Sequence, residues 1–250
     1  MVWVTVGAHM QMPASLLPLF LNDVAFEVGS RRIIDGISMR LDAGPRTMIL
    51  GPNGAGKSVL LRLCHGLLRP TGGSIAWNVT EPAGVPRRQA MVFQRPVMLR
   101  RSALGNVTYA LKLASVPPGE REERAMDALR KVGLESLARR AARVLSGGEQ
   151  QRLALARVWA LHPEALFLDE PTASLDPGAT HEIEKVIAAL HAAGTKIVMV
   201  THNLGQAHRM GDEILFLHQG RLVERAPADR FLKHPNSPEA AQFLEGELPW

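Results

Sequence analysis

The sequence predicts an α/β fold with a largely parallel sheet, and two observations support this class. From residue 147 to residue 200, helical and strand-like segments alternate, an order that is typical of parallel sheets covered by helices. Earlier in the chain, an apolar run at 47–50 leads into the glycine-rich segment GPNGAGKS and then into a helical stretch from Val59 to Leu68. A strand, a tight glycine turn and a helix in this order form a common unit of such sheets.

Turn residues and hydrophobic periodicity place the individual elements. The helical pattern breaks at 116–119, where two prolines and a glycine stand together, and a hairpin turn is expected at Gln219 and Gly220. The helix at 179–193 has its apolar residues on one face, namely Ile183, Val186, Ile187 and Leu190. The expected elements are strands at 19–26, 37–41, 47–50, 74–77 and 90–93, helices across 102–138, a helix at 148–161, a strand at 165–168, a helix at 179–193, strands at 196–200, 212–218 and 221–224, and short helices after residue 227.

Composition narrows the class of protein. The chain has 250 residues, of which 46% are hydrophobic, enough for one large domain with a well-filled core. Its single cysteine, Cys64, excludes a disulfide within the chain and fits a reducing compartment, and we expect this thiol to pack in the core. Residues 1–18 lack the basic start of a signal peptide and are expected to form a loose extension.

The charge pattern argues against a nucleic-acid partner. The net charge is +5, but the arginines come in small groups and no block of five like charges occurs. Aromatic residues make up only 5% of the chain, too few for a platform on which bases could stack. The basic surface is therefore expected to be solvated or to lie near a membrane. No apolar run reaches the roughly 18 residues that a membrane span needs.

Residues 51–58 match the phosphate loop G-x-x-x-x-G-K-[ST], and they stand between a strand and a helix as that loop requires. Glycines let backbone N–H groups curl round phosphate oxygens, and the following helix N-terminus adds a favourable dipole. The sequence therefore predicts that the chain binds a nucleoside triphosphate. The residues expected to surround its phosphates are Gly51, Pro52, Asn53, Gly54, Ala55, Gly56, Lys57 and Ser58.

A second motif stands at the end of an apolar strand. Asp169 and Glu170 follow Phe167 and Leu168, which places two acids at the sheet edge where phosphates bind. Asp169 is suited to hold Mg²⁺, and Glu170 is placed to polarise an attacking water. The alternative is an acid pair at a helix N-terminus after a core strand. Because the phosphate loop is present, we favour the catalytic interpretation.

A third motif, LSGGEQQR at 145–152, allows the family to be named. Ser146 and the amides of Gly147 and Gly148 make an anion-binding helix N-terminus, a geometry that an ordinary serine N-cap shares. This segment resembles the signature motif of ATP-binding cassette (ABC) ATPases. The resemblance covers roughly residues 19–230. Motifs appear in the family's order: the phosphate loop, Gln94 in VFQRP, the signature, the acids at 169–170, Ser174-Leu175-Asp176 and His202.

The resemblance implies an architecture. It is a P-loop NTPase fold of the ABC type, with a mainly parallel sheet core, an antiparallel β-subdomain and an inserted α-helical subdomain at about 95–145. The nucleotide-binding domain is expected at 19–231, preceded by the extension at 1–18 and followed by a tail at 232–250.

The resemblance also implies roles for residues within one chain, with ATP and Mg²⁺ as cofactors. Lys57 would contact the β- and γ-phosphates, Glu170 would act as the catalytic base, and His202 would contact the γ-phosphate and steady the water. The implied catalytic residues are Glu170, His202, Lys57 and Gln94. The implied ligands of Mg²⁺ are Ser58, Gln94 and Asp169. Such a site works by positioning and charge neutralisation, as phosphoryl transfer requires.

Other residues would act across a head-to-tail homodimer in which ATP lies between two subunits. The signature residues Ser146, Gly147, Gly148 and Glu149 would face the partner's phosphate loop, and Asp176 would lie in the loop that crosses the interface. One position departs from the family. Val28 stands where an aromatic residue commonly stacks on adenine, unless the register slips by two and brings Phe26 there. An aliphatic contact holds the base more loosely, which leaves GTP open as a substrate.

The resemblance favours a transporter subunit over other members of the family. The inserted lobe is compact and lacks a heptad run, and the chain has one cassette and no cysteine pairs. A separate integral membrane permease would be the partner, with the cassette bound at the cytoplasmic face of the inner membrane. Residues 92–111 resemble the segment that receives the permease in importers, with Val97, Met98 and Leu99 forming an apolar groove beside Arg100 and Arg101. Alternatively, this stretch simply packs the helical lobe.

The whole-sequence resemblance also suggests a cargo. The phrase RPVMLRRSALGNV and the short lobe around Trp77 are similar to cassettes of inorganic-oxyanion importers, with the tungstate/molybdate group first and phosphate next. Phosphonate or polar amino-acid importers follow. An extracytoplasmic substrate-binding protein would then deliver the solute to the permease. The alternative function is a soluble single-cassette switch that acts on a protein partner, such as a sulfur-cluster assembly accessory ATPase.

Overall fold

The computed structural model describes residues 15–78 and 88–246. The strands are β1 (Leu19–Val28), β2 (Arg31–Leu41), β3 (Thr47–Leu50), β4 (Gly72–Trp77), β5 (Gln89–Val92), β6 (Ala165–Asp169), β7 (Lys196–Val200), β8 (Glu213–His218) and β9 (Arg221–Pro227). The helices are α1 (Lys57–His65), α2 (Ala103–Leu113), α3 (Pro118–Lys131), α4 (Gly147–Leu161), α5 (Pro177–Ala192), α6 (Leu204–Met210), α7 (Ala228–Lys233) and α8 (Pro238–Glu245), with 3-10 turns η1 (Glu135–Leu137) and η2 (Ala142–Val144).

Two sheets form the centre of the molecule. The larger has the order β5-β6-β7-β3-β8-β9 and is parallel except for β9, which pairs antiparallel with β8. The smaller is antiparallel with the order β2-β1-β4. A mainly parallel sheet beside an antiparallel one confirms the expected fold class.

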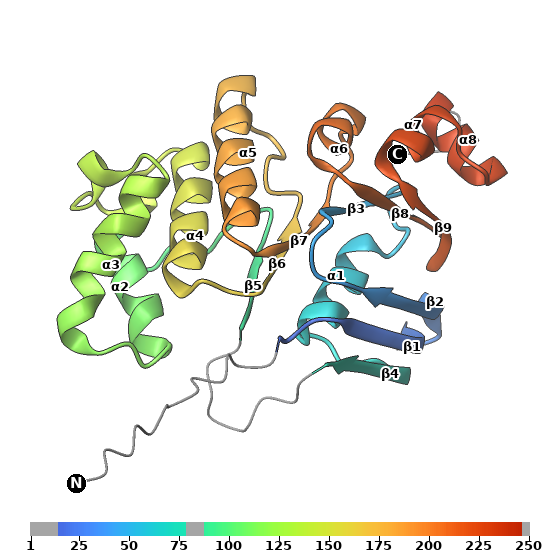
Figure 1. Cartoon of the computed structure of the whole chain (residues 1–250), viewed down its shortest axis with the longest axis horizontal. Helices are drawn as coiled ribbons and strands as arrows, with labels where there is room; N and C mark the ends of the chain where they lie inside the picture. The colour runs from blue at the N-terminus through green and yellow to red at the C-terminus, as the bar shows by residue number, and fades with distance from the viewer. Residues whose placement is uncertain (1–14, 79–87, 247–250) are drawn as a thin grey trace, which may run out of the picture.

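The central strands of the larger sheet, β3, β6 and β7, bury both faces, so each contributes to two cores. In β3, Met48 and Leu50 join one hydrophobic cluster, while Ile49 between them joins the other. The cluster that contains Ile49 also includes residues of α1, β1 and β2, which places α1 between the two sheets (Figure 1). The other cluster lies on the opposite face of the sheet and contains residues of α4 to α8, and it continues into α2 and α3.

Helices α2, α3 and α4 form a group at one end of the molecule, beyond α5 and far from the antiparallel sheet (Figure 1). The inserted lobe thus lies between β5 and α4 in the chain. The expected break at 116–119 lies two residues earlier, at 114–117, because α2 ends at Leu113 and α3 begins at Pro118. Proline lacks an N–H and has a fixed φ, which suits the first position of a helix.

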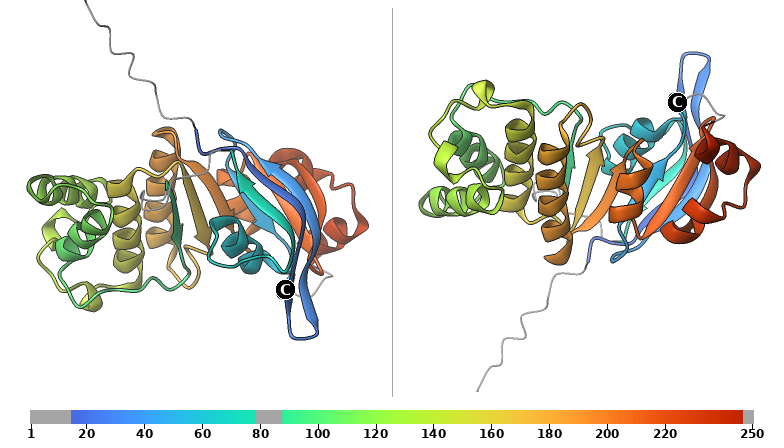
Figure 2. Two further views of the ribbon diagram at one scale, coloured as in Figure 1. Left: turned by 90° about the horizontal axis from the view of Figure 1, so that it is seen from below. Right: turned by 90° about the horizontal axis from the view of Figure 1, so that it is seen from above.

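Strand β2 begins at Arg31, well before the expected start at residue 37. Its first residues are polar, but β2 is an edge strand and leaves them in solvent. Arg32 pairs with Glu27 of β1 at 2.7 Å, so cross-strand charge replaces apolar alternation in holding this end of the hairpin. The hairpin projects from the body of the domain (Figure 2).

Both ends of the described chain pack on the domain. Leu16 and Leu17 are buried, and the backbone N–H of Leu16 donates to Glu164 at 2.7 Å, so this part of the expected loose extension is docked. At the other end, Phe243 of α8 lies 5.2 Å from the ring of Phe216 in β8. Among the described helices, none is long and apolar enough to cross a membrane.

Candidate functional site

The phosphate loop connects β3 to α1, and its first and last glycines are required by close backbone contacts. A Cβ at Gly51 would lie 2.0 Å from the carbonyl oxygen of Leu217, and one at Gly56 would lie 2.9 Å from that of Ile33. Both glycines have positive φ, 145° and 97° respectively. Glycine at both positions therefore lets the loop pack directly against the backbone of β8 and β2.

Lys57 is the first residue of α1 and its side chain is buried in the loop. Its ammonium donates to the carbonyl oxygens of Gly51 at 2.7 Å and Pro52 at 2.9 Å. Burial lowers the pKa of Lys57, while the carboxylates of Glu170 and Asp169 oppose this effect by favouring the charged form. These contacts hold one positive charge inside the loop.

Ser58 and Asp169 meet at the end of β6. The Ser58 hydroxyl donates to Asp169 Oδ1 at 2.7 Å, and a guanidinium nitrogen of Arg62 lies 3.6 Å from Oδ2. The Asp169 side chain is buried, so its orientation is fixed by these two neighbours. A hydroxyl and a carboxylate oxygen side by side are the hard donors that Mg²⁺ prefers, and the pair fits that ion.

Glu170 and His202 form a second pair beside the first. His202 Nδ1 lies 3.1 Å from Glu170 Oε2, and the backbone N–H of Glu170 donates to the carbonyl oxygen of Val200 at 3.1 Å. Glu170 has a φ of 49°, a conformation that few residues with a side chain adopt. Such strain clusters at functional sites, and here it turns the carboxylate toward the histidine.

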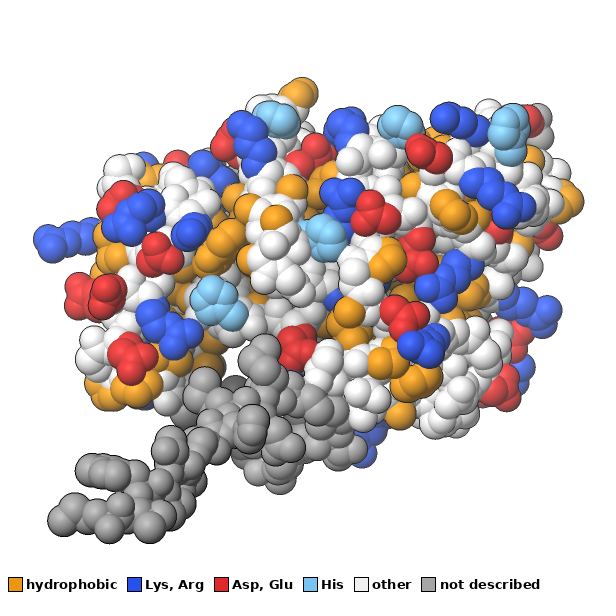
Figure 3. Space-filling model, in the orientation of Figure 1, with side chains coloured by type: hydrophobic (Ala, Val, Ile, Leu, Met, Phe, Trp, Pro, Cys, Tyr) orange, Lys and Arg blue, Asp and Glu red, His pale blue; other side chains and the backbone are white. Residues whose placement is uncertain are grey.

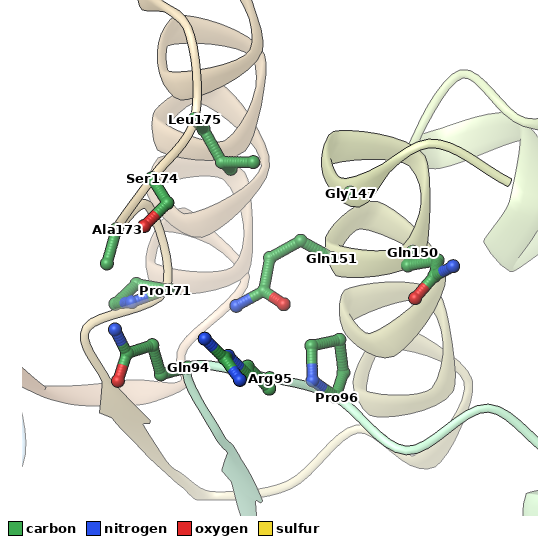
Figure 4. Close-up of a pocket in the computed structure, with 10 residues that line it drawn as sticks. All are labelled: Gln94, Arg95, Pro96, Gly147, Gln150, Gln151, Pro171, Ala173, Ser174 and Leu175. Carbon is green, nitrogen blue, oxygen red and sulfur yellow. The ribbon is translucent and has the colours of Figure 1, made fainter.

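Gln94 lies apart from this group. It lines a cavity of about 320 Å³ between the segment after β5, the start of α4 and the segment 171–175 (Figure 4). Within the described residues, no hydrogen bond joins Gln94 to Ser58 or Asp169. The structure therefore brings two of the three expected magnesium ligands together and leaves the third in the neighbouring cavity.

The signature residues begin α4 as the sequence predicts. Ser146 is the N-cap: its hydroxyl accepts from the N–H of Glu149, whose carboxylate accepts in turn from the N–H of Ser146 at 2.7 Å. That bond is the first cause of the lowered pKa of Glu149. A Cβ at Gly148 would lie 3.0 Å from Ala179 of α5, so α4 and α5 approach closely there. Ser146 and Gly147 are exposed.

Asp176 and Val28 lie at two further exposed points. Asp176 is the N-cap of α5 and accepts from the N–H of Ala179 at 2.9 Å. Val28 is 59% exposed near the tip of the β1–β2 hairpin, opposite Arg31. The register pairs Phe26 with Ile34, and the partly buried Phe26 packs on the cluster between the sheets, whereas Val28 stays in solvent.

Sequence reasoning missed a buried polar group next to the site. Gln206 in α6 is hydrogen-bonded to Thr172, Thr201 and Glu184, which come from three separate segments. No motif marks these residues. The sequence offers only the position of Gln206, in the short helix that begins two residues after His202.

The surface charges agree with the even distribution in the sequence. Many arginines pair with acids, as Arg46 does with Asp212 at 2.8 Å and Arg225 with Glu213 at 2.8 Å. On the face in Figure 3, basic and acidic side chains are interspersed. Positive charge on this face is thus compensated locally.

Comparison with known proteins agrees with this geometry. The model of the ABC transporter family matches residues 34–173. The tungstate uptake system ATP-binding protein TupC of Peptoclostridium acidaminophilum is 40% identical over 209 residues, which cover 83% of this chain and 98% of that protein. The phosphate import ATP-binding protein PstB 2 of Natronomonas pharaonis is 36% identical over 233 residues, which cover 86% of this chain and 82% of that protein.

A solved structure adds a nucleotide-bound example. It is a dimeric ATP-binding cassette in a post-hydrolysis state with ADP and Pi bound; the TM-score is 0.74 and the identity 26%, over 84% of this chain and 98% of that one. The chain belongs to the ABC transporter family. It is an ATP-binding subunit that hydrolyses ATP to drive transport.

Proposed function

We propose that this chain powers a separate membrane permease that imports a solute, an inorganic oxyanion with tungstate first and phosphate next. The observation that carries the ATP-driven part of the proposal is the convergence of Lys57, the Ser58–Asp169 pair and the Glu170–His202 pair at the carboxyl ends of β3, β6 and β7. In parallel sheets, ligands bind at that edge. The group combines a phosphate-binding cation, hard oxygen donors and a base.

Within one chain, each pair has a separate role. Lys57 would exchange its loop carbonyls for the β- and γ-phosphate oxygens of ATP, which attract its charge more strongly. Ser58 and Asp169, with Gln94 from the adjoining cavity, would hold Mg²⁺, which neutralises charge on the phosphates. Glu170 would orient the attacking water and accept its proton, while His202, 3.1 Å away, fixes that carboxylate and reaches the γ-phosphate.

The site is completed by a second copy of the chain. In Figures 1 and 2, α4 and α1 lie on opposite sides of β6 and β7, so one chain keeps the helix that carries the signature apart from the helix that follows the phosphate loop. The exposed amides of the signature would contact the γ-phosphate held by the partner, with Glu149 fixing the turn that presents them. The exposed Asp176 would lie in the same interface. The dimeric relative with bound ADP and Pi supports this arrangement.

A separate apolar groove supports docking of a permease helix. A cavity of about 300 Å³ lies between the segment 90–97 and α4, lined mainly by apolar side chains, including Phe93, Pro96, Val97, Val158 and Leu161. Val97 is 72% exposed. Met98, expected to line this groove, is instead buried in the hydrophobic cluster that contains residues of α2 to α8. The occupant we propose is an amphipathic helix at the cytoplasmic face of the inner membrane.

The cargo is inferred from similarity alone, because the cassette itself does not contact the solute. The more similar of the two relatives above is named for tungstate uptake, and the other for phosphate import. Both names refer to oxyanions. An extracytoplasmic substrate-binding protein would then select the oxyanion for the permease.

The test is capture of the permease from solubilised host membranes with the Glu170→Gln variant, ATP and Mg²⁺, followed by mass spectrometry. We expect one multi-span membrane protein. Adding Val97→Asp should abolish capture of the permease while ATP binding persists. The control is Leu113→Asp, which should leave capture intact, because Leu113 is similarly exposed at the end of α2 but lies outside the groove. Capture of a soluble protein alone would instead indicate the single-cassette switch. Binding of tungstate, molybdate and phosphate by the cognate binding protein then tests the cargo.

A further inference from the structure

One side-chain amide joins the two segments that carry Glu170 and His202. Gln206 is 1% exposed. Its Oε1 accepts from the hydroxyl of Thr201 at 2.8 Å, and its Nε2 donates to the hydroxyl of Thr172 at 3.0 Å and to Glu184 Oε1 at 3.0 Å. Every polar atom of this amide therefore has a partner, and each partner comes from a different part of the chain.

The partners sit next to the proposed catalytic pair. Thr172 follows Glu170 by two residues, and Thr201 directly precedes His202. The Thr201 hydroxyl also accepts from the N–H of Asn203 at 3.1 Å, which fixes the turn that presents the histidine. A displacement of either segment would therefore break a buried hydrogen bond to Gln206, at a cost that is high where water cannot replace the partner.

The chemistry at this position requires an amide. Nε2 faces the buried carboxylate of Glu184, whose other partner is the guanidinium of Arg209 at 2.8 Å. A carboxylate at 206 would stand against Glu184, and an apolar side chain would leave both threonine hydroxyls without this partner. Only a group with one donor end and one acceptor end satisfies all three contacts.

We propose that Gln206 is a positioning residue that clamps the His202 loop to the segment 170–176. The inference rests on the proposed function, in which Glu170 and His202 serve hydrolysis. With the clamp in place, contact of His202 with a γ-phosphate fixes the path of the segment that ends at Asp176. The nucleotide state is thereby passed to the surface where the second copy binds.

Turnover and binding of ATP by Gln206→Leu test the clamp. We expect kcat to fall about 10- to 100-fold, because the base and the histidine lose their relative placement. The Kd for ATP should stay within about twofold, since the phosphate loop is untouched. In the Glu170→Gln background, the same change should weaken the ATP-dependent dimer.

Lys196→Met is the matched control. Lys196 is a buried polar hub at the opposite end of β7, where its ammonium donates to the carbonyl oxygen of Pro45 and to the Thr47 hydroxyl at 2.8 Å. This variant should lose stability but keep kcat. The clamp is refuted if Gln206→Leu keeps kcat within about twofold of wild type, or if its kcat falls by no more than that of Lys196→Met.

A double-mutant cycle tests the same idea with isosteric changes that preserve the fold. Thr172→Val cuts one arm of the clamp, and Thr201→Val cuts the other together with the bond from the Asn203 N–H. The cycle subtracts that extra bond, because it is lost whether or not Thr172 is present, so the effects on kcat should still be strongly non-additive. Multiplicative effects would overturn the proposal. Parallel measurements on Glu170→Gln and His202→Ala separate the two levels: if these keep turnover, the proposed catalytic roles fail, whereas if they lose it and the cycle is additive, only the clamp fails.

Discussion

Gly51 offers a sharp test of the phosphate loop, because the structure leaves no room for a methyl group there. A Cβ at this position would lie 2.0 Å from the carbonyl oxygen of Leu217, and real contacts of this kind are essentially never shorter than 3.0 Å. Gly51 directly follows β3, and Leu217 lies in the neighbouring strand β8, so the new methyl group would meet fixed backbone. The loop in Gly51→Ala must therefore move by about 1 Å or more, since no side chain can yield.

The displacement acts directly on ATP. The carbonyl oxygen of Gly51 accepts from Lys57 at 2.7 Å, so the ammonium and the loop amides shift together. A misplacement of about 1 Å costs roughly 100-fold in rate, and we expect kcat/KM for ATP to fall by that factor, equivalent to about 2.7 kcal/mol. The overpacked variant should also lose about 1–3 kcal/mol of unfolding free energy.

Gly73→Ala separates the catalytic loss from the loss of stability. A Cβ there would lie 2.1 Å from the carbonyl oxygen of Asp23, an equal backbone clash in the antiparallel sheet and outside the phosphate loop. Steady-state ATP hydrolysis and urea unfolding should be measured for both variants. Similar destabilisation with kcat/KM reduced only in Gly51→Ala is the expected result. Undiminished kcat/KM in Gly51→Ala, or an equal loss in Gly73→Ala, would refute the reasoning.

Three further predictions concern the base, the C-terminal helices and the thiol. Val28→Tyr should bind ATP about tenfold more tightly, a gain of about 1.4 kcal/mol from stacking on adenine, and equilibrium titration with ATP and GTP checks this. Glu224→Gln should lose roughly 3 kcal/mol in urea unfolding, because an amide cannot accept all the bonds from Asn236 and Ser237, whereas the exposed Glu245→Gln should change little. Burial raises the pKa of the Glu224 carboxyl, but the donors of Asn236 and Ser237 outweigh this and leave the pKa lowered. The contribution of Glu224 to the unfolding free energy is thus complete above its ordinary pKa of about 4.3 and is lost as pH falls through the lower folded value. The Gln variant should therefore show a flatter dependence of stability on pH in acid. Complete burial raises the pKa of the Cys64 thiol to about 12, so a maleimide at pH 8 should label it only after unfolding.

The parts of the site that the sequence predicted are those whose chemistry needs a fixed spacing. Loop glycines, the lysine and the serine must stand in one order if backbone amides and two side chains are to address the same phosphate group, as the proposed function requires. For the same reason, Asp169 could be placed from an apolar strand that ends in an acid, and the structure has it bonded to Ser58 at 2.7 Å. Local rules of this kind can be read from eight consecutive residues.

The parts that the sequence did not predict depend on contacts between distant segments. Gln206 bonds to residues 34 and 22 positions away, and nothing in its neighbourhood distinguishes it from a surface glutamine. Met98 was placed in a docking groove because residues 92–111 resemble the docking segment of importers, yet one position along from the exposed Val97 the side chain turns into the core. The start of β2 was misplaced because polar residues in an edge strand carry no apolar alternation.

The two halves of the proposed hydrolytic site are built differently, and the difference bears on how the chain would switch. Lys57 and Asp169 are buried and held by short bonds, so the half that binds ATP first is already formed in one chain. Ser146 and Asp176 are exposed caps of α4 and α5, and the helix N-termini that they cap face solvent. Since a helix N-terminus gains most from a nearby anion, two copies should bind each other tightly only while the γ-phosphate is present. The permease would then be driven by loss of that phosphate. Gln206 would lie between His202, which contacts the phosphate, and the surface at which the two copies separate.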